Sequence, residues 1–196
     1  MRLNADLISK TQQYLNPLNQ FYIDLRGYKI PYLENLAATN DQFECIDLTE
    51  NDIAKLDELP QLLRLETILL ANNKIAAIEP NFAEVCPKLD SLILTNNRLA
   101  RLEDIDQLGT CHTLQRLYLM GNLVCNLTDY RLYTIHRIPS LKVLDFQMVT
   151  LAEREAALKL FGMASHMEGQ SMTKGEAVTA EAAAKMEAEA AAATTV

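Results

Sequence analysis

The sequence predicts an α/β fold: a leucine-rich-repeat solenoid with a concave parallel β-sheet, an N-terminal capping helix and a C-terminal leucine-rich-repeat cap. Three observations predict it. Leucine supplies 32 of the 196 residues, and none lies beyond Leu160. The frame Leu-x-x-Leu-x-Leu-x-x-Asn-x-Leu, with Ile, Val or Phe allowed at the leucines, occurs four times. Its asparagines, Asn51, Asn73, Asn97 and Asn122, lie 22, 24 and 25 residues apart, which is within the period of such repeats.

Two degenerate copies flank these four. The copy at residues 23–30 has Tyr28 in the asparagine position, and the copy at residues 141–151 has Val149 there. Terminal repeats of a solenoid are expected to be atypical, because each must cover a core that would otherwise meet water. We therefore expect about six repeats in all.

Each copy contains a short strand with alternating side chains. Ile68 and Leu70 are expected to point into the core, whereas Thr67, Leu69 and Ala71 point out. The asparagine of the frame should be buried, where it bridges backbone groups of neighbouring turns that have no partner in the sheet.

Both ends carry signals of a cap. Residues 5–15 are predicted to form a helix, with Asn4 as its N-cap and Pro17 ending it. A second helix is predicted over residues 130–138. The pattern Thr150-Leu-Ala-Glu153 is a capping box, which predicts a closing helix that runs to about residue 161.

The composition changes after the last cap. Residues 177–193 are mostly alanine and glutamate, with no leucine, isoleucine or aromatic side chain that could bury an apolar face. We therefore predict a leucine-rich-repeat domain at residues 1–161 and a disordered Ala/Glu-rich tail at residues 162–196.

Composition and motifs disfavour several classes of protein. The net charge of −8 argues against a protein that holds nucleic acid mainly by its own charge. No apolar run is long enough to span a membrane, and four irregularly spaced cysteines do not suggest a disulfide scaffold. We find no nucleophile–base pair, phosphate-binding loop or clustered metal ligands. We therefore expect no enzyme activity, no metal, no cofactor and no membrane association, in a cytosolic or nuclear protein.

The outward positions of the predicted strands indicate a binding surface instead. They form three columns, of which the middle one contains Asp24, Asp47, Leu69, Ile93, Tyr118 and Asp145. Leu69, Ile93 and Tyr118 are large, apolar and adjacent, although the core faces the other way. A contiguous apolar strip of this kind usually marks a partner site. The aspartates at the two ends of the column would suit basic side chains on that partner.

Three blocks of sequence resemble a known family. They are residues 24–31 followed by 34–36, then residues 92–97, and finally the cap at residues 130–133, 139, 143–147 and 153–154. These blocks are similar to those of the U2 small nuclear ribonucleoprotein A-prime family, over roughly residues 1–161. The resemblance implies a non-catalytic nuclear splicing component. It implies that the concave face holds a helix of an RNA-recognition-motif protein of the B-double-prime type, and that the pair binds a U2 RNA stem-loop beside other U2 particle and spliceosome proteins.

The resemblance and the outward columns together give candidate site residues. The predicted partner-binding set is Tyr22, Asp24, Arg26, Asp47, Thr49, Leu69, Ile93, Tyr118 and Met120. Candidates for RNA contact are Arg26, Arg116, Lys142 and Arg154. A leucine-rich-repeat regulatory subunit that binds a different protein, such as a phosphatase or a cytoskeletal motor, is the alternative.

Overall fold

The structure is a computed structural model that describes residues 2–33, 35–57 and 59–162. Contacts within the chain define one compact unit over Met1–Leu158, and a second begins at Lys159. The tail from residue 163 on lies outside the described residues. The predicted domain boundary and the predicted disorder of the tail therefore stay predictions.

Short strands and short helices make up the chain. The helices, including the 3₁₀ helices labelled η, are α1 Ala5–Lys10, η1 Leu36–Thr39, α2 Phe82–Val85, η2 Leu102–Thr110, η3 Leu123–Asn126, α3 Tyr130–Arg137 and α4 Leu151–Phe161. The strands are β1 Gln13–Leu15, β2 Phe21–Asp24, β3 Cys45–Asp47, β4 Lys55–Leu56, β5 Thr67–Leu69, β6 Ala77–Ile78, β7 Ser91–Ile93, β8 Arg116–Tyr118, β9 Val143–Leu144 and β10 Gln147–Met148.

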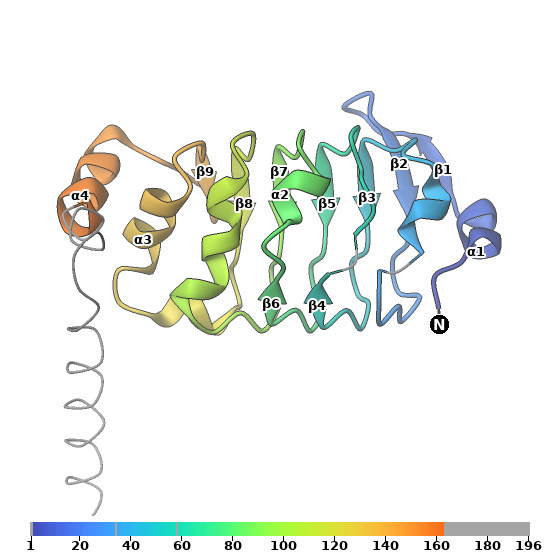
Figure 1. Cartoon of the computed structure of the whole chain (residues 1–196), viewed down its shortest axis with the longest axis horizontal. Helices are drawn as coiled ribbons and strands as arrows, with labels where there is room; N and C mark the ends of the chain where they lie inside the picture. The colour runs from blue at the N-terminus through green and yellow to red at the C-terminus, as the bar shows by residue number, and fades with distance from the viewer. Residues whose placement is uncertain (1, 34, 58, 163–196) are drawn as a thin grey trace, which may run out of the picture. The chain divides into compact units, whose positions relative to one another are not determined.

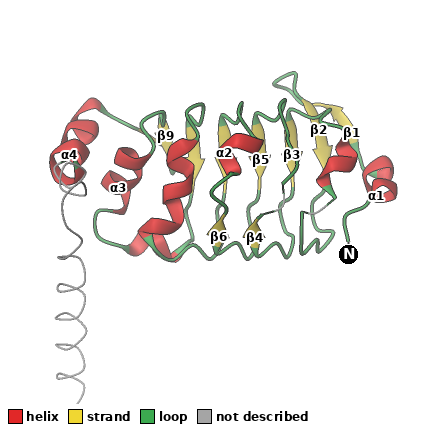
Figure 2. Ribbon diagram, viewed as in Figure 1, coloured by secondary structure: helices red, strands yellow, loops and turns green. Residues whose placement is uncertain are grey.

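The main sheet has eight strands in the order β1-β2-β3-β5-β7-β8-β9-β10. All neighbours from β2 to β9 pair in parallel, whereas β1 and β10 run antiparallel to β2 and β9. Figure 1 shows the strands side by side from β2 to β9, and Figure 2 shows α2 passing in front of them. This arrangement confirms the predicted leucine-rich-repeat solenoid.

The core is a ladder of aliphatic side chains in register. Ile23, Ile46 and Ile68 are paired across neighbouring strands, and Leu92 and Leu117 continue the ladder. Each of these five side chains is at most 1% exposed. Burying one such side chain contributes about 1.5–3 kcal/mol, so the frame itself supplies much of the stability.

The four asparagines form the predicted second ladder. The side chain of Asn97 is typical: its Oδ1 accepts a hydrogen bond from the Ile75 amide at 2.9 Å, and its Nδ2 donates to the carbonyls of Leu70 and Leu94 at 2.9 Å each. Asn51, Asn73 and Asn122 make the equivalent contacts in their own repeats. Each asparagine therefore ties two turns together, as the sequence predicted.

The N-terminal cap differs from the prediction. Asn4 does cap α1, since its Oδ1 accepts from the Leu7 amide at 2.8 Å, but the helix ends at Lys10. Residues Gln13–Leu15 form strand β1 instead and pair with β2, so a helix over residues 5–15 is wrong. The physical reason is the free edge of β2, whose backbone groups need partners that a helix could not provide.

The C-terminal cap follows the prediction closely. Helix α3 spans Tyr130–Arg137, and α4 begins at Leu151 behind the expected capping box. The Thr150 amide donates to Glu153 Oε2 at 2.8 Å, and the Glu153 amide donates to Thr150 Oγ1 at 3.3 Å. Arg131 strengthens this cap through an ion pair with Glu153 at 2.6 Å.

Candidate protein-binding surface

The outward column of the sheet lies in the register that the sequence predicted. Asp24, Asp47, Leu69, Ile93 and Tyr118 are successive partners across β2, β3, β5, β7 and β8. The side chains of Leu69, Ile93 and Tyr118 are half-buried although they face away from the core. We call these three residues the concave strip.

A pocket opens at one end of the concave strip. Its volume is ≈ 400 Å³, and its lining residues are Leu18, Thr67, Ser91, Ile93, Arg116, Tyr118 and Phe146. The small side chains on β5 and β7 form its floor, and larger side chains form its walls. We call it the concave pocket.

Two walls of the concave pocket were not predicted. Leu18, in the turn between β1 and β2, is 75% exposed, and Phe146, in the turn between β9 and β10, is 73% exposed. The ring centroid of Phe146 lies 4.6 Å from that of Tyr118. Leu18 was missed because residues 5–15 were expected to be helical, which hides the β1–β2 hairpin. Phe146 belongs to a block that carries the family resemblance, but no alternation pattern marks a residue in a turn.

The N-terminal end of the column is held by hydrogen bonds. Arg26 Nη2 pairs with Asp24 Oδ2 at 2.6 Å, and Arg26 Nε lies 3.5 Å from Asp47 Oδ2. The Tyr22 hydroxyl donates to Asp47 Oδ2 at 2.6 Å, and the Thr49 amide donates to Asp47 Oδ1 at 2.9 Å. The hydrogen bonds from Arg26 hold the pKa of the Asp24 carboxyl below its usual value, so this carboxyl is ionised at neutral pH.

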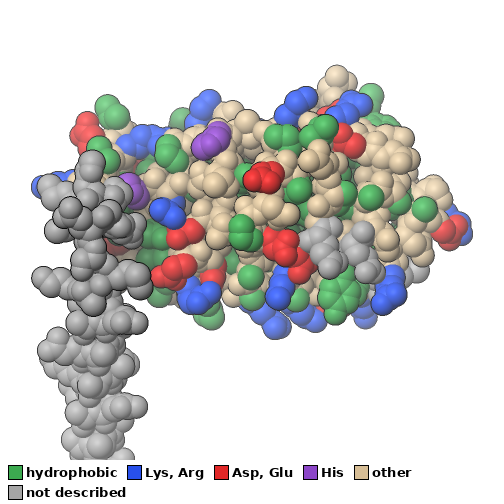
Figure 3. Space-filling model, in the orientation of Figure 1, with side chains coloured by type: hydrophobic (Ala, Val, Ile, Leu, Met, Phe, Trp, Pro, Cys, Tyr) green, Lys and Arg blue, Asp and Glu red, His purple; other side chains and the backbone are tan. Residues whose placement is uncertain are grey.

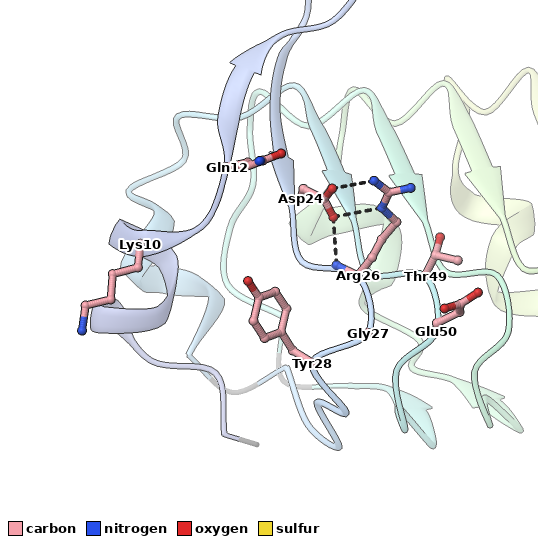
Figure 4. A pocket seen from close by; sticks show the side chains of 8 residues that line it. All are labelled: Lys10, Gln12, Asp24, Arg26, Gly27, Tyr28, Thr49 and Glu50. Atoms are coloured by element: carbon pink, nitrogen blue, oxygen red, sulfur yellow. Dashed lines mark hydrogen bonds and ion pairs between the residues drawn. The ribbon is translucent and has the colours of Figure 1, made fainter.

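Not every predicted contact residue offers surface to a partner. Tyr22 and Asp47 are only 8% and 4% exposed, so they support this end of the surface without forming much of it. A second pocket, of ≈ 470 Å³, lies at this end of the column. Figure 4 shows that Arg26 folds back on Asp24 beside Thr49 and that the ring of Tyr28 faces this second pocket. A partner that approaches here meets the Asp24–Arg26 pair and the rim of that pocket.

The aspartate at the other end of the column is held by two hydrogen bonds within the fold. Asp145 Oδ1 accepts from the Leu119 amide at 2.7 Å, and its Oδ2 accepts from the Tyr130 hydroxyl at 2.8 Å. Both carboxylate oxygens therefore already bind groups of the fold, and the expectation that this aspartate receives a basic side chain stays a prediction. Met120, at the side of the strip, is 45% exposed and remains accessible.

The four RNA candidates do not form one patch. Arg116, Lys142 and Arg154 lie at the β8–β9 end, whereas Arg26 lies beyond β2 at the opposite end. Arg116 pairs with Asp90 and donates to Ser91 Oγ at 2.6 Å, and Arg154 donates to the carbonyls of Pro139, at 2.9 Å, and Leu141. Lys142 is exposed.

Positive charge is also interspersed with negative charge elsewhere. Figure 3 shows basic and acidic side chains together along the edge on which β4 and β6 lie, where Lys74 pairs with Asp52 at 2.5 Å. Within the described ranges, no group of three or more His, Cys, Asp or Glu side chains could hold a metal ion. None of the helices in that part of the chain is long and apolar enough to cross a membrane.

The repeats, the asparagine ladder and the two caps define the class of this chain: it is a leucine-rich-repeat protein with an apolar strip on an open sheet. A family model described as "Leucine-rich repeat" matches residues 1–177. The U2 small nuclear ribonucleoprotein A′ of Homo sapiens is 47% identical over 161 residues, which cover 82% of this chain and 63% of that protein. The Schizosaccharomyces pombe protein of the same name is 43% identical over 162 residues, covering 83% of this chain and 68% of that protein.

A solved structure agrees with these relatives. A chain in the crystal structure of the Drosophila melanogaster SNF/U2A′ complex superposes with a TM-score of 0.81 at 41% identity, over 92% of this chain and 99% of that chain. The chain therefore belongs to the U2 small nuclear ribonucleoprotein A′ family. Its match spans 63–65% of the length of the human, Caenorhabditis elegans and Arabidopsis thaliana relatives.

Proposed function

We propose that this protein is a non-catalytic scaffold of the U2 small nuclear ribonucleoprotein in pre-mRNA splicing. Its concave face holds one helix of an RNA-recognition-motif protein of the B-double-prime type, and it thereby supports the binding of that partner to a U2 RNA stem-loop. The observation that carries the proposal is the concave strip, an apolar surface for which folding has no need.

The dimensions of the strip suit a helix. Neighbouring strands of a sheet lie about 4.8 Å apart, and side chains at i and i+4 of a helix repeat at about 5–6 Å along its axis. A helix that crosses the strands can therefore place successive apolar side chains against Leu69, Ile93 and Tyr118. Buried apolar and aromatic side chains near the centre of an interface contribute most of its affinity.

The charges favour an indirect role in RNA binding. The chain carries a net charge of −8, and Arg26 and Arg116 already pair with aspartates. Phosphate contacts with Lys and Arg supply a large share of the affinity of proteins for nucleic acid, so the RNA contact is proposed to come mainly from the partner. Membership of a spliceosomal family supports location in the nucleus, no membrane association, and contact with other U2 particle and spliceosome proteins.

The strip can be tested by making it polar without disturbing the strands. We expect the double variant Leu69→Thr, Ile93→Thr to bind the Drosophila SNF protein at least ~10-fold more weakly than the unmodified chain, by isothermal titration calorimetry, since the apolar contacts of the interface centre are lost. Threonine is preferred to aspartate because a carboxylate at position 69 would lie beside Asp47 in the register. Leu123→Thr, at a residue that is 64% exposed outside the strip, is the matched control.

The same preparations separate the competing functions. The isolated chain should show no salt-sensitive binding to a U2 stem-loop at micromolar concentration, and the RNA should bind once the partner is added. Unchanged binding of SNF by the double variant would refute the role of the strip. Recovery of a phosphatase or motor with the tagged chain, without U2 RNA, would favour the alternative class of regulator.

A further inference from the structure

The turn between β9 and β10 has an unusual backbone. Leu144 pairs with Gln147, so the hairpin loop consists of Asp145 and Phe146 alone. Both have positive φ, 49° and 63° respectively. A two-residue loop with two positive φ values favours glycine, asparagine or aspartate, because a Cβ crowds the backbone there and only a short polar side chain offsets this with a local hydrogen bond. Asp145 fits this rule, but Phe146 does not.

The fold gains little from placing an aromatic residue in that turn. The side chain of Phe146 is 73% exposed, and its described ring contact is with Tyr118, at 4.6 Å between centroids and an interplanar angle of 48°. The turn itself is held by Asp145, which binds the Leu119 amide and the Tyr130 hydroxyl. A strained residue that persists without burial points to a role outside folding.

The position of the ring indicates that role. Phe146 lines the concave pocket together with Ile93 and Tyr118, and it extends the concave strip beyond β8. We propose that Phe146 is a partner-contact residue whose ring packs against an apolar side chain of the docked partner helix. This inference rests on the proposed function, and it adds a residue that the alternating strand pattern cannot mark.

A protein partner suits this site better than an RNA base. The one arginine that lines the concave pocket, Arg116, is neutralised by Asp90 and also bound to Ser91 Oγ. Asp145, which directly precedes Phe146 in the sequence, adds a second carboxylate next to this residue. Stacking of a base on an aromatic ring is normally accompanied by cations that track the phosphates, and the lining of the concave pocket supplies no cation besides the paired Arg116.

The test is the variant Phe146→Asn, measured in the absence of RNA. Asparagine accepts a positive φ, so the unfolding temperature should stay the same or rise, while the affinity for SNF should fall at least ~10-fold. Phe146→Tyr, which keeps the ring, should bind like the unmodified chain. Leu158→Asn removes an apolar side chain of similar exposure, 64%, on α4 and should leave the affinity unchanged.

The outcomes distinguish this inference from the proposed function. If Phe146→Asn binds SNF within twofold of the unmodified chain while Leu69→Thr, Ile93→Thr loses binding, Phe146 is no contact and only the inference is wrong. If the unmodified chain does not bind SNF at all, the proposed function itself is wrong. A loss that appears only with RNA present, or one accompanied by a melting temperature more than ~5 °C lower, also contradicts the proposal.

Discussion

Replacing Asn97 with leucine tests the hydrogen-bond ladder that joins the repeats. Leucine has as many side-chain heavy atoms as asparagine and branches at the same carbon, so the change removes the amide and keeps the branched shape of the side chain. The amide of Ile75 then has no acceptor, since it donates to Asn97 Oδ1. The carbonyls of Leu70 and Leu94 each lose one donor but keep another, because Leu70 also accepts from Asn73 and Leu94 also accepts from Asn122.

The magnitude follows from those three groups. A buried amide without an acceptor costs about 1–3 kcal/mol, and each net hydrogen bond lost from a carbonyl that keeps a second donor costs about 0.5–1 kcal/mol. The sum is about 3 kcal/mol. For a domain of this size, that corresponds to a fall of roughly 10 °C in the unfolding temperature.

Asn51 is expected to be more sensitive than Asn97. Its Nδ2 donates to the carbonyl of Leu25 at 2.8 Å, and the preceding repeat has Tyr28 where a second asparagine would stand. In the described part of the chain, no second donor to the carbonyl of Leu25 is found. Asn51→Leu therefore leaves one amide and one carbonyl unpaired and should cost about 1 kcal/mol more than Asn97→Leu.

Urea unfolding followed by far-UV circular dichroism measures these differences, with the slope of the transition checked for two-state behaviour. Asn126→Leu, at an exposed residue outside the ladder, is the control and should change stability by less than ~0.5 kcal/mol. The reasoning is refuted if Asn97→Leu is as stable as the unmodified chain, or if Asn51→Leu is the milder of the two.

Two further predictions concern a turn and a cap. Gly121→Ala should destabilise the fold by at least ~2 kcal/mol in urea unfolding, because at φ +78° the new Cβ would lie 2.1 Å from Asn96 Oδ1. Gly27→Ala is the control: its φ is +73° but nothing lies within 4 Å, so it should cost only ~1 kcal/mol. Equal losses of stability in the two variants would contradict this reasoning. The hydrogen bond from Arg131 lowers the pKa of Glu153 to about 2, so the stability it contributes is present above the unfolded pKa and is lost as pH falls through about 2. Glu153→Gln should therefore be ~1–2 kcal/mol less stable at pH 7, and thermal melts should show this difference shrinking below pH ~4.5; a difference independent of pH would rule out the ion pair as its cause.

The repeats were predictable because their signals are local and repeated. The alternation of Ile68 and Leu70 with Thr67 and Leu69 indicates a strand with one buried face, and an asparagine in phase aligns each strand with the next. Because the strands could be aligned in this way, the pairing of Leu69, Ile93 and Tyr118 on neighbouring strands could also be predicted. A single such strand would not have identified the fold, whereas four copies of the frame in phase did.

The N-terminal hairpin could not be predicted in this way. Leu7, Thr11 and Leu15 have helical spacing, but the helix ends at Thr11, whose backbone is extended at φ −77° and ψ 151°. Whether residues Gln13–Leu15 continue as a helix or pair as a strand depends on the free edge of β2, which is a tertiary feature. That error also hid Leu18 as a wall of the concave pocket.

Phe146, the wall of the concave pocket at the C-terminal end, was not predicted for another reason. A positive φ cannot be inferred for a phenylalanine from composition, and the orientation of Asp145 is decided by Tyr130 and Leu119, which are distant in sequence. Partner contact by the nine predicted residues stays a prediction. The structure adds that Tyr22 and Asp47 are nearly covered.

The reversed strands at the two ends of the sheet have a consequence for assembly. A parallel solenoid is in principle open to endless growth, since the last strand of one molecule could pair with the first strand of the next and continue the same ladder into a fibre. In this chain β1 and β10 run against the other strands and contain three and two residues. A second copy would therefore meet an edge of only two or three residues, which offers few backbone groups for pairing. The two end strands therefore disfavour end-to-end assembly of copies and leave the concave face of the sheet available to a different protein.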